Sequence, residues 1–203
     1  MKKYIVEFIG TFFLVLSIIA TVSELGEHNF LAPIGIGCAL IALIYAGGHI
    51  SRAHYNPVVT LAFLLKGEID NKDVFPYLLA QLFAGGLAAL IATTLLEIKT
   101  TLVQHTWMAG LTAELLGTFM LVFVILNVAI AKTTASNEFY GLAIGFTVIG
   151  MAYALGGKSW AAFNPAVALS LSFAQMMSWS DLWFYLVGSL GGSLLAVFVF
   201  NTL

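Results

Sequence analysis

Long apolar runs separated by short polar segments make up most of the chain. Six of these runs have about the 20 residues that an α-helix needs to cross the hydrocarbon core of a membrane. We therefore expect spanning helices at about Tyr4–Val22, Leu31–Ile50, Val74–Leu96, Met108–Ala131, Phe139–Leu155 and Leu182–Phe200. The pattern predicts an all-α membrane protein, in which each helix satisfies its own backbone hydrogen bonds inside the bilayer.

Two further apolar stretches, Pro57–Leu65 and Pro165–Phe173, are too short to cross a bilayer. Each follows directly on an asparagine, Asn56 or Asn164. Asparagine is a strong helix N-cap, and proline fits the first helical turn, where its missing N–H would be unsatisfied anyway. Each short stretch is therefore expected to be a re-entrant half-helix that begins at its Asn-Pro pair.

The two halves of the chain are similar to each other at an offset of about 107–110 residues. The segment "VEFIGTFFLVL" aligns with "AELLGTFMLVF", which pairs Glu7 with Glu114, and the two Asn-Pro pairs align in nearly the same register. Each half holds three spans, an odd number, so the second half is expected to lie upside down relative to the first. We expect a single domain over residues 1–203, with inverted repeats of about 1–100 and 108–203.

Inverted half-helices have an electrostatic consequence at the centre of the membrane. They enter from opposite sides, so their positive dipole ends meet near the midplane. Asn56 and Asn164 are then able to direct side-chain amide donors at one point. A neutral oxygen at that point accepts hydrogen bonds from both, whereas a cation meets two positive helix ends.

Composition and charge agree with a membrane location. The chain is 61% hydrophobic and 9% charged, and its net charge of −2 gives no indication of a nucleic-acid partner. Both termini are expected in the cytoplasm, because six basic residues then lie inside and two outside. The inside set is Lys2, Lys3, Arg52, Lys66, Lys72 and Lys132, and the outside set is Lys99 and Lys158. The short loops suggest a bacterial inner membrane.

Candidate catalytic and metal-binding residues are scarce. The single cysteine, Cys38, lies in an apolar run and is expected to be a free thiol in the core. The histidines are scattered without metal-ligand spacing, and no Ser/His/Asp set is evident. They are His28, His49, His54 and His105. We therefore expect no metal, no cofactor and no enzymatic activity.

Taken together, these motifs resemble those of the aquaporins (major intrinsic proteins). The resemblance covers essentially the whole chain, with six spans, two half-helices, paired glutamates and the stretch "SRAHYNPVVT". The two motifs read Asn56-Pro57-Val58, where the family usually has alanine in third place, and Asn164-Pro165-Ala166. The resemblance implies a passive channel for water or small neutral solutes, assembled in the lipid bilayer as a homotetramer with one pore per protomer.

The resemblance also assigns roles to three buried polar residues. It implies that Glu7 and Glu114 accept hydrogen bonds from the backbone of the two loops, and that His54 supports the first loop beside the pore. A carboxylate inside a membrane needs such partners. The alternatives are a Glu7 that lies loosely at the interface and a His54 that is simply packed.

Counting from the motifs places the four selectivity-filter positions of the family at Ile36, Ala152, Ala161 and Val167. Family filters for water usually hold an aromatic residue, a histidine and an arginine, and here Val167 takes the arginine's place. We expect a wide, apolar outer constriction that binds water weakly. Glycerol, urea and metalloid hydroxides such as arsenous acid are the expected solutes, although Ala168 stands where glycerol channels usually have aspartate.

Two charges lie near the motifs. Arg52 precedes the first motif and Lys158 the second, so each is able to bring positive charge to one mouth of the pore. The alternative is that these side chains extend to lipid headgroups.

Two other classes of protein remain open. An ion-coupled transporter also uses inverted repeats and broken helices, but it would normally carry membrane-embedded acids beyond Glu7 and Glu114. A structural membrane protein with a closed pore is the second alternative.

Overall fold

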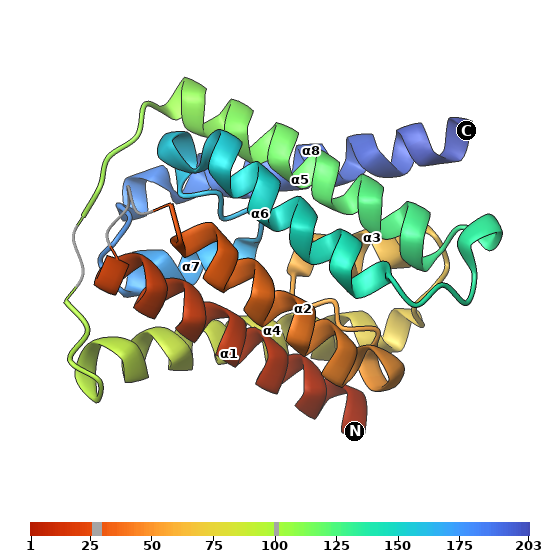
Figure 1. Cartoon of the computed structure of the whole chain (residues 1–203), viewed down its shortest axis with the longest axis horizontal. Coiled ribbons are helices and arrows are strands. Elements are labelled where there is room, and N and C mark those ends of the chain that lie inside the picture. Colours follow the sequence, from red (N-terminus) through yellow and green to blue (C-terminus); the bar gives the residue numbers. More distant parts are fainter. Residues whose placement is uncertain (26–29, 100–101) are drawn as a thin grey trace.

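The computed structural model describes residues 1–25, 30–99 and 102–203, and every regular element in these ranges is a helix (Figure 1). In the first half the helices are α1 (Lys2–Leu25), α2 (Ala32–Ser51), α3 (Pro57–Leu65) and α4 (Asn71–Thr94). In the second half they are α5 (Trp107–Ala129), α6 (Tyr140–Ser159), α7 (Pro165–Phe173) and α8 (Leu182–Thr202). Two short 3₁₀ turns, Lys132–Thr134 and Trp179–Asp181, precede α6 and α8.

The predicted set of six spans and two half-helices is confirmed. Six helices are long and apolar enough to cross a membrane, while α3 and α7 begin and end at the predicted residues. The largest difference at a helix end is in α6, which continues past the expected end at Leu155 to Ser159. The glycines there do not end the helix, because its ladder runs on to the left-handed residue Trp160, whose N–H donates to the carbonyl of Gly156.

The helices of each half pack on one another, and the two halves meet where α2 packs on α6, α4 on α7 and α3 on α8. In the first half α1 packs against α2 and α4, and in the second half α5 packs against α6 and α8. A Cβ on Gly37 would lie 3.0 Å from the carbonyl oxygen of Gly145, and a Cβ on Gly145 would lie 3.0 Å from that of Gly37. The two glycines therefore permit the close α2–α6 crossing.

The half-helices extend toward opposite ends of the bundle. Figure 1 shows α3 toward the end that holds both termini and α7 toward the other end. Each begins inside the bundle, at Asn56 or Asn164, so the N-termini of α3 and α7 face each other within it. This is the inverted arrangement that the sequence predicted.

Large apolar side chains cover the outward faces of the long helices. Phe13, Phe83, Phe146 and Phe198 are all more than half exposed, as expected for a surface that contacts lipid. Cys38 also lies on the outside: its thiol is free, but the expectation that it belongs to the core is wrong. An apolar run in a membrane helix gives no indication of which face meets lipid, because both faces are apolar.

Candidate functional site

Asn56 and Asn164 cap the two half-helices in the same way. Both have an extended backbone, with φ/ψ of −156°/122° and −159°/115°. The side-chain oxygen of Asn56 accepts from the N–H of Val58 at 3.0 Å, and that of Asn164 accepts from Ala166 at 2.9 Å. The caps satisfy helix donors that would otherwise be orphaned in the membrane interior.

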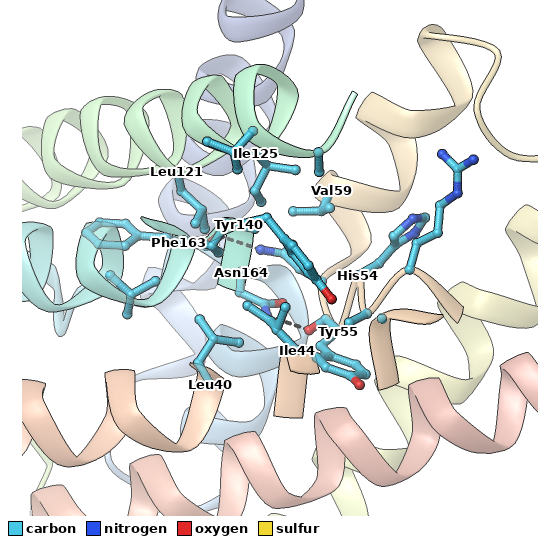
Figure 2. Close-up of a pocket in the computed structure, with 18 of the residues that line it drawn as sticks. Leu40, Ile44, His54, Tyr55, Val59, Leu121, Ile125, Tyr140, Phe163 and Asn164 are labelled. Atoms are coloured by element: carbon cyan, nitrogen blue, oxygen red, sulfur yellow. Dashed lines mark hydrogen bonds between the residues drawn. The ribbon is translucent and has the colours of Figure 1, made fainter. Parts of the chain in front are cut away.

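The same two side chains also connect the loops. Asn56 Nδ2 donates to the carbonyl of Phe163 at 2.9 Å, and Asn164 Nδ2 donates to the carbonyl of Tyr55 at 2.8 Å. The dashed lines in Figure 2 mark hydrogen bonds of this set. An amide nitrogen carries two hydrogens, so each asparagine keeps one donor beyond this reciprocal bond. Both asparagines line the central cavity.

Each loop before an Asn-Pro pair contains three non-glycine residues with positive φ. This conformation costs roughly 1–2 kcal/mol per residue for an L-amino acid, so other contacts must hold it in place. The φ angles are 67°, 52° and 47° at Arg52, Ala53 and Tyr55, and 61°, 51° and 47° at Trp160, Ala161 and Phe163.

Glu7, fully buried on α1, holds the first loop. Its carboxyl group accepts four hydrogen bonds, two of them from the backbone of the strained loop. The donors are Ser51 Oγ at 2.7 Å, His54 N at 2.9 Å, Tyr55 N at 2.7 Å and Gln81 Nε2 at 2.9 Å. This number of donors is what a carboxylate needs inside a membrane.

Glu114, fully buried on α5, holds the second loop through three donors. They are Ser159 Oγ at 2.7 Å, Ala162 N at 3.0 Å and Phe163 N at 2.7 Å. The two glutamates therefore occupy equivalent positions, each accepting one serine hydroxyl and two consecutive backbone N–H groups.

His54 lies beside the first loop, in contact with both α3 and α4. Its Nδ1 is 3.1 Å from Thr60 Oγ1, which also accepts from Gln81 Nε2 at 3.0 Å. Its ring packs against Phe63, with a centroid distance of 4.1 Å, and against Tyr77. The structure therefore places His54 both in the support of the loop and on the wall of the cavity.

A single cavity of about 430 Å³ joins both asparagines to the four positions counted from the motifs, Ile36, Ala152, Ala161 and Val167. Its middle section is walled by apolar side chains. Figure 2 shows Leu121 and Ile125 of α5 on one side and Leu40 and Ile44 of α2 on the other. A polar guest in this section has few side-chain partners besides the asparagines.

The lining also contains Trp160 and Glu68, which the sequence did not single out. Trp160 lies beside Ala161, and its indole Nε1 is buried without a hydrogen-bond partner among the described residues. Arg52 lines the opposite end together with Glu68, whereas Lys158 is exposed and does not belong to the lining. Nothing in the local sequence marks Trp160, because its position depends on a left-handed backbone that tryptophan rarely adopts.

The described ranges contain no group of three His, Cys, Asp or Glu side chains placed to hold a metal ion. His28 lies outside the described residues.

Comparison with known proteins identifies the family. The family model "Major intrinsic protein" matches residues 1–200. "Aquaporin NIP1-1" of Zea mays is 31% identical over 98% of this chain and 74% of its own length. "Glycerol uptake facilitator protein-like 6" of Lactiplantibacillus plantarum is 32% identical over 98% of this chain and 96% of its own.

A solved structure supports the fold independently. The aquaglyceroporin from Plasmodium falciparum superposes with a TM-score of 0.86 at 20% identity, covering all of this chain and 96% of its own. At that identity the likeness concerns the fold alone. With the family model matching nearly the full length, the chain belongs to the major intrinsic protein family.

Proposed function

We propose that this protein is a passive channel for water and small neutral solutes, formed by residues 1–203 as one channel domain built from two inverted repeats. The observation that carries the proposal is the single cavity that joins both capping asparagines to the four filter positions. We further propose that it resides in a bacterial inner membrane with both termini in the cytoplasm, as a homotetramer with one pore per protomer.

The centre of the cavity favours neutral guests. The N-termini of α3 and α7 meet there, and each brings a partial positive charge. The free amide hydrogens of Asn56 and Asn164 are able to donate to a hydroxyl or water oxygen. A cation would lose its hydration shell and find donors instead of acceptors, so its passage is opposed.

The outer constriction favours solutes larger and less polar than water. Ile36, Ala152, Ala161 and Val167 offer no polar side-chain atom, which leaves the backbone carbonyls of the second loop as acceptors. Glycerol, urea and metalloid hydroxides such as arsenous acid suit this lining. The relative from Lactiplantibacillus plantarum is called a glycerol uptake facilitator, which supports glycerol as one of them.

The buried acids argue against an ion-coupled transporter. Glu7 and Glu114 already accept four and three hydrogen bonds from the protein. Asp73, at the first turn of α4, pairs with Lys3 and accepts from the hydroxyl of Tyr4. None of these carboxyl groups is left open to bind a coupling ion.

Flux measurements in one preparation of proteoliposomes test the proposal. Stopped-flow light scattering should give water, glycerol, urea and arsenous acid fluxes that rise linearly with the gradient and exceed those of empty liposomes. Solute accumulation driven by an ion gradient would show that the protein is a transporter and not a channel. Fluxes equal to those of empty liposomes would instead indicate a closed-pore structural protein.

A substitution at the outer constriction tests the filter assignment. Val167→Arg should narrow the pore, so that glycerol flux falls relative to water flux. Lys158→Ala is the matched control, because Lys158 is exposed and outside the cavity lining. An unchanged glycerol-to-water ratio in Val167→Arg would show that Val167 does not border the constriction.

A further inference from the structure

Arg52 and Glu68 form an ion pair at the end of the cavity opposite the outer constriction. Arg52 Nη1 donates to Glu68 Oε2 at 2.6 Å, and both side chains line the cavity. They are the only Lys, Arg, Asp or Glu residues in the described lining. Their side chains are 51% and 35% exposed, so solvent and solutes are able to reach the pair.

The backbone holds both partners in position. Arg52 has a left-handed backbone, with φ 67°, and its N–H donates to the carbonyl of Gly48 at 2.9 Å. Its guanidinium lies 5.8 Å from the ring centroid of Phe63, within the range of a cation–π contact. Glu68 follows Gly67, whose φ is +69°, and its N–H donates to the carbonyl of Phe63 at 2.8 Å. The end of α2 therefore positions Arg52, and the last turn of α3 positions Glu68 and contacts Arg52 through Phe63.

A second cavity of about 290 Å³ adjoins the pair. It shares Arg52, His54 and Glu68 with the main cavity, and its other charged lining residues are Lys3, Asp70 and Asp73. Those charges are already balanced, because Lys3 pairs with Asp73 and Asp70 lies 3.2 Å from Lys72. Within the described residues, the Arg52–Glu68 pair thus borders both cavities, and the pair has no net charge.

We propose that Arg52 and Glu68 form a charge-balanced selectivity site at this mouth, which supplies the charged hydrogen-bonding groups that the outer constriction lacks. The structure gives the guanidinium one acceptor among the described residues, Glu68, although it carries five N–H donors. A hydroxylated or amide solute that enters the pore gives up hydrogen bonds to water. The remaining N–H groups of Arg52 donate to that solute in their place. Glu68 positions Arg52 and cancels its charge, so that neither cations nor anions concentrate at the mouth.

This proposal rests on the proposed channel function. It is tested by two single variants, which should shift the ratio of K⁺ leak to nitrate leak in opposite directions. Arg52→Gln leaves Glu68 unbalanced and should raise K⁺ leak, whereas Glu68→Gln leaves Arg52 unbalanced and should raise nitrate leak. We expect about a threefold rise in each case, because a unit charge about 7 Å away in a water-like medium changes an ion's energy by about RT. Each ion leak is measured in proteoliposomes and divided by the water flux of the same sample.

The double variant and the salt dependence complete the experiment. Arg52→Gln with Glu68→Gln should return both ion leaks to the wild-type level, but lower glycerol flux about threefold because the guanidinium donors are lost. The single-variant effects should shrink in strong salt, since the screening length falls from about 10 Å at about 0.1 M to about 3 Å at about 1 M.

The outcomes separate the two proposals. If the wild type conducts no solute, the channel function fails. If it conducts but the ratio of K⁺ leak to nitrate leak shifts in the same direction in both single variants, or in neither, the pair is only a structural contact and the selectivity site is overturned. Water flux of each variant shows that the pore has folded, and Lys158→Gln is the matched control for a charge outside the lining.

Discussion

The first loop, residues 51–56, and the second loop, residues 159–164, follow nearly the same backbone path. The left-handed residue after each helix has φ 67° at Arg52 and 61° at Trp160. In each loop a buried glutamate accepts two consecutive backbone N–H groups, and an asparagine donates to the opposite loop. The two loops therefore share both a conformation and the contacts that hold it.

The supports around the two loops differ. In the first half, Gln81 adds a fourth donor to Glu7 and also donates to Thr60. In the second half, the residue at the corresponding position is Ser189, which donates to Leu186 within its own helix at 3.3 Å. The hydroxyl of Tyr77 donates to the carbonyl of Ser51 at 2.9 Å, whereas the hydroxyl of Tyr185 is buried without a partner among the described residues. The first loop is thus embedded in a polar network and the second in mostly apolar packing.

The largest expected difference between the halves concerns the two glutamates. In Glu7→Gln the new NH₂ group faces either His54 N beside Ser51 Oγ, whose hydroxyl is able to rotate and accept, or Tyr55 N beside Gln81 Nε2. In Glu114→Gln it is able to face Phe163 N alone. Each placement in Glu7→Gln therefore disturbs two contacts and the best placement in Glu114→Gln one, so at about 1–3 kcal/mol per orphaned buried donor Glu7→Gln should be the more destabilising. Thermal unfolding of the detergent-solubilised protein, followed by tryptophan fluorescence, measures both. Equal losses would show that the fourth donor contributes nothing.

The asparagines should behave alike, because their contacts are the same in both halves. Asn56→Ala and Asn164→Ala each remove an N-cap worth about 1 kcal/mol and a cross-loop hydrogen bond worth about 1 kcal/mol. We expect each variant to lose about 2 kcal/mol of stability together with similar fractions of water flux. A difference larger than about 1 kcal/mol between them would mean that the polar network of the first half extends to its cap.

The glycines beneath the loops should show a smaller asymmetry. A Cβ on Gly10 would collide with the ring of Tyr55, and a Cβ on Gly117 with the ring of Phe163. Overpacking of this kind costs about 1–3 kcal/mol. Gly10→Ala should be the worse of the two in thermal unfolding, because the hydroxyl of Tyr55 donates to the carbonyl of Leu43 at 3.0 Å and restrains the ring. Adding Tyr55→Phe should remove the difference; if it persists, the hydroxyl is not the restraint.

The sequence predicts the helices and half-helices of this molecule better than the contacts that support its loops. Asn-Pro pairs carry their own local signal, a cap followed by a residue suited to the first turn, so the half-helices could be placed to the residue. The proposed filter positions come from the family resemblance, by counting from those pairs. All four of them line the cavity.

Contacts between distant helices have no such local signal. The pairing of Gln81 with Glu7 and of Arg52 with Glu68 depends on how separate helices pack in space. The outward position of Cys38 was missed for a related reason, since hydrophobic periodicity fades in a membrane helix that is apolar on every face. Trp160 was missed because positive φ is expected at glycine, not tryptophan.

The smallest expected effect separates the two halves most cleanly, because the same atom is removed from both. Tyr77→Phe deletes a hydroxyl that donates to the carbonyl of Ser51 and should lower stability by about 1 kcal/mol. Tyr185→Phe deletes a buried hydroxyl that has no partner among the described residues, so its stability should stay the same or rise slightly. Parallel thermal unfolding curves give the comparison. A loss in Tyr185→Phe equal to that in Tyr77→Phe would mean that the hydroxyl of Tyr185 is hydrogen-bonded in the folded protein, and that the second loop is supported as the first one is.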